Sequence, residues 1–319
     1  MRVHVQNTPG DPDFAIGPAL WRAMGGPAEV SFGDSQAAFE AGLGEAEALV
    51  TSTVELRRHF PCPAPSLKLI FCTSAGLDRL APFDWLPAGV RLLNNSGVHG
   101  ARAGEYAAMA LLMLAGGMPE LIEAQRAGIW RKRYGSVLAG RRVAVVGTGG
   151  MGAAAGRVAR LFGMQAVGVR TRAVPHPDFA EVIAVAGLDA LLPTVEFLLL
   201  AAPLTPQTRG MLDRARMQLL PRGAGVINIG RGALLDQEAL CDALDAGHLG
   251  GAVLDVFEPE PIPRGHRLWT TRNLVITPHV AADDPATYAR DSVALFLRNL
   301  EAFAAGAEMP SVFDTARGY

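Results

Sequence analysis

The sequence predicts an α/β protein with two domains, each built on a parallel sheet. Short apolar runs alternate with helix-like segments along most of the chain, which is typical of parallel sheets covered by helices. A glycine-rich turn, Gly147 to Gly152, divides this alternation into two series. A length of 319 residues fits two domains with substantial cores.

The composition narrows the classes of function. Hydrophobic residues make up 50% of the chain and charged residues 19%, as in globular proteins. The net charge of −2 gives no reason to expect nucleic acid or an anionic membrane as a partner. We interpret the basic cluster Arg131 to Arg133 as the solvated end of a helix. No spacing typical of metal ligands occurs, so no metal site is expected.

Three features favour a cytoplasmic location. Met1 leads directly into a strand-like segment, without the pattern of a signal peptide. The longest apolar runs are too short to cross a bilayer. The cysteines Cys62, Cys72 and Cys241 are odd in number and lack Cys-x-x-Cys spacing, so we expect reduced, buried thiols.

The first series of strands and helices precedes the glycine turn and predicts a small α/β domain. The loop Thr73 to Asp78 follows its fourth strand, at the carboxyl edge where such sheets bind ligands. A buried helix over 100–113 and a second helical stretch reaching Trp130 follow this series, and we expect Trp130 to pack in a core. Strands are expected at 3–5, 29–32, 48–52, 67–72 and 90–94, and helices at 13–24 and 35–41.

The second series has the strand number of a doubly wound sheet. A final helix over 286–304 has no strand of its own, and we expect it to pack on the first domain. Strands are expected at 143–146, 165–170, 196–202, 225–229, 251–257 and 273–277, and helices at 153–162, 179–185, 211–220 and 236–246.

The glycine turn has the spacing of a dinucleotide-binding site. Gly147, Gly149 and Gly152 follow a buried strand as Gly-x-Gly-x-x-Gly and lead into a helix. Glycines allow the backbone to approach a pyrophosphate, which the amide groups and dipole of the helix N-terminus then bind. The sequence therefore predicts a Rossmann-like domain.

Three polar segments follow later strands of the second series. They contain Arg231, Glu260 and His279, which could converge because the carboxyl ends of parallel strands share one edge. A guanidinium can bind the carboxylate of a keto acid through paired hydrogen bonds. An imidazolium beside a carboxylate can donate a proton to the carbonyl oxygen as hydride reaches its carbon. These residue types predict the reduction of a 2-keto acid.

Four motifs carry a resemblance to a known family. In chain order they are Gly-x-Gly-x-x-Gly, Asn-Ile-Gly-Arg-Gly-Ala-Leu-Leu-Asp, Leu-Asp-Val-Phe-Glu-Pro-Glu-Pro and Ile-Thr-Pro-His-Val-Ala-Ala. They resemble the D-isomer-specific 2-hydroxyacid dehydrogenases, and most of all the glyoxylate/hydroxypyruvate reductases. The resemblance covers nearly the whole chain, since Ser74 to Asp78 and Ala201 to Arg209 also match.

This resemblance implies a domain arrangement. It predicts two Rossmann-like/flavodoxin-like domains with parallel sheets and a cleft between them. Residues 1–98 plus 286–319 would form the substrate (catalytic) domain, and residues 99–285 the dinucleotide-binding domain. A homodimer is also implied, and the resemblance allows Trp130 to approach a substrate pocket as the alternative to a place in a core.

The resemblance further implies roles for individual residues. His279 would be the catalytic acid/base, Glu260 its partner, and Arg231 a substrate ligand. The backbone of Ala75, Gly76 and Leu77 would hold the substrate carboxylate. Asp255 would contact the carboxamide of the nicotinamide. The other implied cofactor contacts are Gly147, Gly149, Gly150, Met151, Gly152, Pro203, Ile229, Gly230, His279 and Ala281.

The cofactor choice depends on residues about 20 positions after the glycine turn. NAD-binding domains of this kind carry an acidic residue there, which binds the ribose hydroxyls. This sequence has Arg170, Thr171 and Arg172 instead. Two guanidiniums and a hydroxyl attract a 2′-phosphate, so NADP(H) is preferred and NAD(H) is the alternative. If both arginines face solvent without contacting the cofactor, the sequence gives no reason to prefer NADP(H).

Two other functions stay open at this point. The first is an NAD(H)-sensing binding protein on the same fold, which the intact Arg, Glu and His set argues against. The second is a phosphoglycerate-type dehydrogenase. Arg170 and the absence of a regulatory domain before Tyr319 argue against that function.

Overall fold

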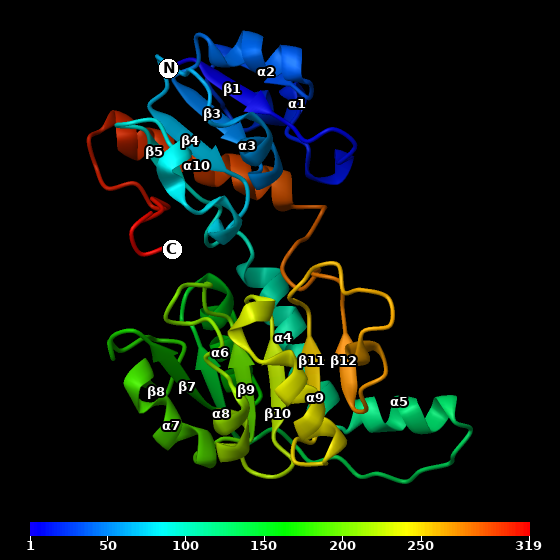
Figure 1. Ribbon diagram of the computed structural model, residues 1–319. Coiled ribbons are helices and arrows are strands. Elements are labelled where there is room, and N and C mark those ends of the chain that lie inside the picture. Colours follow the sequence, from blue (N-terminus) through cyan, green and yellow to red (C-terminus); the bar gives the residue numbers. More distant parts are fainter. The chain divides into compact units, whose positions relative to one another are not determined.

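The computed structural model describes all 319 residues and divides the chain into two compact units. Unit 1 comprises Met1–Val98 and Asp284–Tyr319, and unit 2 comprises His99–Asp283 (Figure 1). Each unit contains one sheet, and every strand pair within it is parallel. The predicted fold class is confirmed.

Unit 1 has a five-stranded sheet in the order β2-β1-β3-β4-β5. Its strands are β1 (Val3–Gln6), β2 (Val30–Gly33), β3 (Ala48–Thr51), β4 (Leu69–Cys72) and β5 (Arg91–Leu93). Its helices are α1 (Pro18–Ala23), α2 (Gln36–Leu43), α3 (Thr53–His59) and α10 (Tyr288–Ala304), with short 3-10 helices η1 (Pro12–Phe14), η2 (Asp78–Leu80) and η3 (Phe83–Trp85).

Helices cover both faces of the unit 1 sheet. On one face Trp21 of α1 and Phe296 of α10 pack together, with ring centroids 5.6 Å apart. On the other face Phe39 of α2 and Leu56 of α3 are buried. A parallel sheet that is covered on both sides needs apolar residues at consecutive positions, which explains the apolar runs in the sequence.

Unit 2 has a seven-stranded sheet in the order β12-β11-β10-β9-β6-β7-β8, which is the doubly wound order. Its strands are β6 (Arg142–Val146), β7 (Gln165–Arg170), β8 (Glu181–Ala184), β9 (Phe197–Leu200), β10 (Gly225–Asn228), β11 (Gly251–Leu254) and β12 (Leu274–Ile276). Its helices are α4 (Gly100–Ala115), α5 (Met118–Arg126), α6 (Gly150–Leu161), α7 (Leu188–Leu191), α8 (Arg214–Leu219) and α9 (Gln237–Asp245), with 3-10 helices η4 (Val185–Gly187), η5 (Leu192–Thr194), η6 (Gly232–Leu234) and η7 (Arg267–Trp269).

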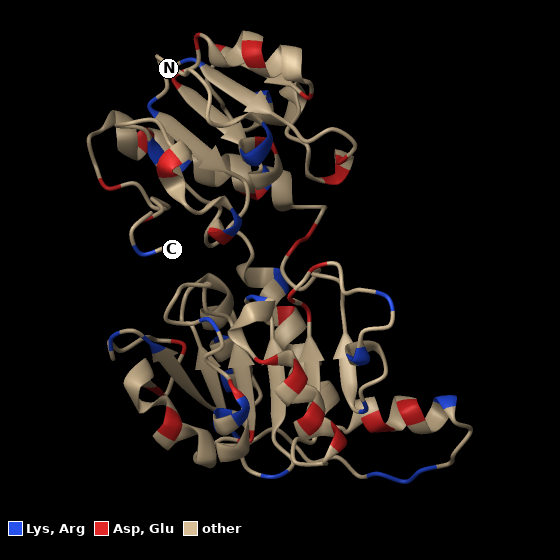
Figure 2. Ribbon diagram, viewed as in Figure 1, with Lys and Arg blue, Asp and Glu red and all other residues tan.

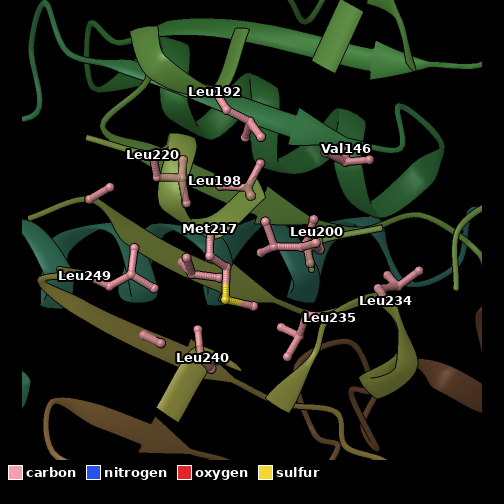
Figure 3. Close-up of a cluster of buried hydrophobic side chains, with 14 of the residues drawn as sticks. Val146, Leu192, Leu198, Leu200, Met217, Leu220, Leu234, Leu235, Leu240 and Leu249 are labelled. Carbon is pink, nitrogen blue, oxygen red and sulfur yellow. The ribbon is translucent and has the colours of Figure 1, made fainter. Parts of the chain in front are cut away.

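The unit 2 sheet is also buried on both faces. Figure 3 shows one face, where Leu198 and Leu200 of β9 lie among side chains that include Met217 of α8 and Leu240 of α9. Tyr106 of α4 belongs to the core on the opposite face. Burying one such leucine or methionine contributes about 1.5–3 kcal/mol, so the two cores fix the strand ends that carry the polar residues.

Three local predictions were wrong or incomplete. The helix expected at 179–185 is absent, because Glu181–Ala184 forms the edge strand β8 beside β7, as the β-branched Val182 and Ile183 favour. The helix expected at 13–24 begins only at Pro18, after Gly17. Helix α3 was missed, although Ser52 followed by Glu55 is a capping signal, and the Ser52 hydroxyl accepts the Glu55 amide at 3.3 Å.

The segment after α5 also differs from expectation. Helix α5 ends at Arg126, and residues 129–137 form an exposed arm without regular structure. Trp130 is 91% exposed there, so its expected place in a core was wrong. Arg131 to Arg133 lie on this arm and not at a helix end, and Figure 2 shows them as a basic stretch. Arg131 and Arg133 both form ion pairs with Glu120 of α5.

The cysteines are free, and two of the three are buried. Cys72 and Cys241 are buried as expected, but Cys62 is half-buried. No single helix has the length and apolar character to cross a membrane, although α4 and α5, taken together as a bent pair, meet those two criteria.

Candidate active site

The glycine turn connects β6 to α6 beside β9, where the strand order of unit 2 reverses. Gly147 has a φ of +92°, and a Cβ atom there would lie 2.7 Å from the backbone of Ala202. A Cβ atom at Gly152 would lie 1.7 Å from the carbonyl oxygen of Gly147, so neither position accepts a larger residue. The first-turn amides of α6, from Gly150 and Met151 onward, have no intrahelical acceptor. This cradle fits a pyrophosphate.

The residues after β7 present positive charge to solvent. The side chains of Arg170, Thr171 and Arg172 are exposed, and neither guanidinium forms an ion pair. Arg157 of α6 provides a contrast, because two of its nitrogens contact the Asp178 carboxylate at 3.2 Å each. Arg170 and Arg172 therefore remain uncompensated cations at the carboxyl edge of the sheet.

The loop after β10 is fixed by a residue that the sequence analysis did not single out. Asn228 is fully buried, and its side chain accepts the Gly230 amide at 3.1 Å and donates to the Arg231 carbonyl at 2.9 Å. A Cβ atom at Gly230 would lie 2.9 Å from the Ala202 carbonyl, so the loop packs closely on the segment after β9. Asn228 is the first residue of the Asn-Ile-Gly-Arg-Gly motif, and this position in the motif could have indicated its role in fixing the loop.

Two other expected cofactor contacts lie in the same region. Ile229 is buried. Pro203 is exposed, and its carbonyl accepts the Thr208 hydroxyl at 2.7 Å. Arg231 is half-buried, and its Nη1 donates to the Gly230 carbonyl at 2.8 Å.

His279 and Glu260 form a direct pair. Oε1 of Glu260 accepts the Phe257 amide at 2.8 Å, and Oε2 lies 2.9 Å from Nδ1 of His279. A carboxylate can only accept a hydrogen bond, so Nδ1 carries a proton and Nε2 is left for another partner. The side chain of His279 is 46% exposed and that of Glu260 only 16%. This arrangement allows Nε2 to hold and release a proton.

The backbone of His279 is in the left-handed region, with a φ of +57°. Its amide donates to the carbonyl of Asp255 at 2.8 Å. The Asp255 carboxylate also accepts the amides of Val280 and Ala281, both at 2.9 Å. A non-glycine residue keeps such a conformation only where its surroundings hold it there. Asp255, which is 1% exposed, therefore clamps the turn that carries His279.

In unit 1, the loop after β4 leaves several amide groups free. The Thr73 carbonyl accepts from Nδ2 of Asn95 at 2.8 Å and also from the hydroxyl of Tyr288. The Ala75 carbonyl accepts from Nδ2 of Asn94 at 2.8 Å. The amides of residues 75–77 donate to no group of the protein. Successive free amides fit an anion such as a carboxylate. The paired asparagines after β5 were the available signal in the sequence for this loop.

Each expected site residue thus lies at a carboxyl edge of a sheet. Arg231, Glu260 and His279 follow β10, β11 and β12, which are neighbouring strands. Ala75, Gly76 and Leu77 follow β4 of the other unit. A doubly wound sheet with a glycine turn at its reversal point is the architecture of a dinucleotide-binding protein.

Comparison with known proteins agrees with this architecture. Residues 108–281 match the family model "D-isomer specific 2-hydroxyacid dehydrogenase, NAD binding domain". A glyoxylate reductase of Thermococcus kodakarensis is 32% identical over 79% of this chain and 78% of its own length. A glyoxylate reductase/hydroxypyruvate reductase of Mus musculus is 34% identical over 77% and 76%.

A solved structure resembles the whole chain. It is an NADPH-dependent glyoxylate/hydroxypyruvate reductase from Sinorhizobium meliloti in complex with NADP and sulfate. The TM-score is 0.83 and the identity 27%, with all of both chains covered. The chain belongs to the family of D-isomer specific 2-hydroxyacid dehydrogenases. It is an oxidoreductase with a nicotinamide cofactor, so the predicted family, enzyme class and kind of cofactor are confirmed.

Proposed function

We propose that this protein is an NADPH-preferring reductase of small 2-keto acids such as glyoxylate or hydroxypyruvate, which produces the D-2-hydroxy acid. The observation that carries this proposal is the His279–Glu260 pair at 2.9 Å, with Nε2 of His279 on the half-exposed side chain. The glyoxylate reductase of Thermococcus kodakarensis supports glyoxylate as a substrate, and the glyoxylate reductase/hydroxypyruvate reductase of Mus musculus supports both keto acids.

His279 is the proton donor in this reaction. When bound, the nicotinamide cofactor would supply the hydride that the carbonyl carbon of the substrate accepts. The electron pair of the C=O π bond moves to oxygen, which takes the proton from Nε2 of His279. Glu260 stabilises the imidazolium through Nδ1 and keeps the ring in one orientation.

Each unit has a group that can bind a carboxylate. The Arg231 guanidinium can form paired hydrogen bonds with a carboxylate and an adjacent carbonyl. The free amides of Ala75, Gly76 and Leu77 in unit 1 are a second anion-binding group. Converting the keto acid to its methyl ester should therefore lower kcat/KM strongly, and equal turnover of acid and ester would argue against this anchor.

The cofactor is held mainly by backbone groups. The N-terminus of α6, with Gly147 to Gly152, would hold the pyrophosphate, and Arg170, Thr171 and Arg172 would hold the 2′-phosphate of NADPH. The S. meliloti relative binds NADP, which supports this preference. Asp255 keeps one acceptor position on Oδ2 after its bonds within the turn, which suits the nicotinamide carboxamide. Pro203, Ile229, Gly230, His279 and Ala281 complete the proposed cofactor contacts.

A cytoplasmic homodimer is part of the proposal. The arm of residues 129–137 exposes Trp130, Tyr134 and Val137 by 91%, 90% and 77%. Aromatic side chains exposed to this degree favour a protein interface, and a second copy of the chain is the partner we propose. Free cysteines favour a reducing compartment. Sedimentation of the wild type and of the Trp130→Ala/Tyr134→Ala variant tests the dimer, because the variant should sediment as a monomer.

One screen tests the activity. Glyoxylate, hydroxypyruvate, pyruvate and phenylpyruvate are each supplied with NADPH and with NADH, and cofactor oxidation is followed at 340 nm. We expect turnover of at least one keto acid, faster with NADPH. Tight NADPH binding without turnover of any keto acid would contradict the proposal and favour a nucleotide-sensing binding protein.

A further inference from the structure

We propose that Tyr106, in the middle of helix α4, is a positioning residue that holds His279 in its reactive orientation through Thr277 and Asp255. The inference rests on the proposed role of His279 as proton donor. It assigns a task to a helix that contributes no residue to the expected site.

A continuous chain of hydrogen bonds runs from α4 to the turn of His279. The Tyr106 hydroxyl lies 2.5 Å from Oγ1 of Thr277, and that hydroxyl donates to Oδ1 of Asp255 at 2.6 Å. The Asp255 carboxylate then accepts the amides of Val280 and Ala281 at 2.9 Å each. Tyr106 and Asp255 are each 1% exposed, and Thr277 between them is half-buried.

The direction of each bond follows from the chemistry of the groups. The carboxylate only accepts, so the single hydroxyl proton of Thr277 points to Asp255. Tyr106 must then donate to Thr277. Burial raises the pKa of Tyr106 to about 12, so its hydroxyl keeps this proton over the working pH range. All donors point toward Asp255, and hydrogen bonds aligned in this way strengthen one another.

The chain acts on a strained segment. His279 has a φ of +57° and follows Thr277 by two residues, so both flanks of His279 are attached to Asp255. Relaxing either flank would let φ return toward the usual negative range and would move the imidazole away from Glu260. Thr277 alone could rotate its hydroxyl; the bond from Tyr106 fixes it and links it to the rigid helix α4.

Tyr106 also packs in the core, and the test must separate packing from positioning. Its ring lies in the buried cluster that α4 and α6 form on the sheet. Tyr106→Phe keeps the ring and removes only the hydroxyl. We expect kcat to fall about threefold to tenfold, the usual effect of one lost hydrogen bond, while the KM for NADPH stays constant.

Two substitutions at Thr277 test the middle link of the hydrogen-bond chain, between Tyr106 and Asp255. Thr277→Val removes the hydroxyl, and it should lower kcat at least as much as Tyr106→Phe. Thr277→Ser keeps the hydroxyl and should lose far less. In the Thr277→Val background, Tyr106→Phe should have no further effect on kcat, because the connection is already broken.

A matched control removes a buried hydroxyl elsewhere in unit 2. Thr271 is buried, and its hydroxyl donates to the Arg267 carbonyl at 3.0 Å, away from the turn of His279. Thr271→Val should keep wild-type kcat. If both Thr271→Val and Tyr106→Phe lowered kcat equally, the effect would be a general loss of stability and the proposal would fail.

A second measurement does not depend on turnover. Amide hydrogen exchange of residues 279–281 is followed in the protein without cofactor. Tyr106→Phe and Thr277→Val should speed exchange at Val280 and Ala281 at least threefold, and Thr271→Val should not. If no keto acid were reduced, the proposed function would fail, while this exchange result would still test the positioning.

Unchanged kcat together with unchanged exchange in Tyr106→Phe overturns the inference. If Tyr106→Phe fails to fold, the Thr277→Val and Thr277→Ser pair decides in the same way. Equal kcat and equal exchange in those two variants would then overturn it.

Discussion

The two units each contain a histidine paired with a glutamate, and the two pairs differ in what they leave free. In α3, Nε2 of His59 lies 3.0 Å from Glu55, and both side chains are 1% exposed. In the turn after β12, Nδ1 of His279 lies 2.9 Å from Glu260, and the histidine is 46% exposed. The ring of His59 also stacks on Phe39, with centroids 4.0 Å apart.

This difference separates a structural pair from a reactive one. The side chain of His59 is buried, with Nε2 beside Glu55 and Nδ1 enclosed without a hydrogen-bond partner, so neither nitrogen can reach a bound substrate. Nε2 of His279 lies on an exposed ring, held by a strained turn at a strand end. A close His–Glu distance alone therefore predicts nothing about function. The prediction that His279 donates a proton rests on its exposed Nε2 and on its position at the carboxyl edge of the sheet.

The largest expected effect is on turnover. His279→Ala should lower kcat by about a hundredfold or more, because the carbonyl oxygen loses its proton donor. His59→Ala should leave kcat unchanged and lower the free energy of unfolding by about 2–5 kcal/mol, since it opens a cavity and leaves Glu55 with one partner fewer. Steady-state kinetics and urea unfolding of both variants check this. A His279→Ala enzyme with wild-type kcat would contradict the reactive role of His279. A His59→Ala enzyme that is inactive but stable would contradict the structural role of His59.

The same reasoning applies to arginines and cofactor choice. Arg157 is held by Asp178, whereas Arg170 has no acidic partner. Arg170→Asp should lower the NADPH to NADH ratio of kcat/KM about tenfold to a hundredfold, because it removes a charge-assisted bond to the 2′-phosphate and adds repulsion. Arg157→Gln is the matched control and should keep the ratio. A wild type that prefers NADH, or a ratio that Arg170→Asp does not change, would show that Arg170 has no contact with the cofactor.

Glu260→Gln sharpens the comparison at the pair itself. Oε1 of the glutamine can keep the Phe257 amide bond, so its NH₂ group would face Nδ1 of His279. That contact favours a ring without a proton on Nδ1 and removes the anion that stabilises the imidazolium. We expect about tenfold slower reduction at neutral pH and a pH–rate profile moved to lower pH. A profile at the wild-type pH would mean that Glu260 does not influence proton donation by His279.

Much of this arrangement could be predicted from sequence, for a physical reason. The strands are short apolar runs bounded by glycine and polar residues, and each polar motif follows one of them directly. The order of strands and motifs along the chain therefore predicted that Arg231, Glu260 and His279 lie at the ends of neighbouring strands. The β8 edge strand was mistaken for a helix because four residues show too little periodicity to separate the two structures.

The missed residues depend on long-range contacts. Tyr106 and Thr277 are 171 positions apart, and α4 showed only the alanine and leucine pattern of a buried helix. The Thr73 carbonyl accepts from Asn95, 22 positions away, and from Tyr288, 215 positions away. Trp130 was placed in a core from its residue type alone, whereas Gly128 lets the chain leave α5 as an exposed arm.

The smallest expected effect concerns a third histidine, His4 of β1, which extends the comparison to stability. Its Nε2 lies 3.1 Å from the Gln6 side-chain oxygen and its Nδ1 lies 2.8 Å from the Ser31 hydroxyl, so the neutral ring has both nitrogens occupied.

Burial lowers the pKa of His4 below its ordinary value of 6.5, and the bond to Gln6 offsets part of this change. Below pH 6.5 the unfolded chain thus binds more protons at this position than the folded one. Stability from His4 is present above that pH and is lost as the pH falls toward the lower folded pKa. The free energy of unfolding, measured with urea at about pH 7.5 and about pH 5, should fall more on acidification in the wild type than in His4→Gln. Equal losses in the two proteins would mean that His4 becomes protonated as easily in the fold as in water.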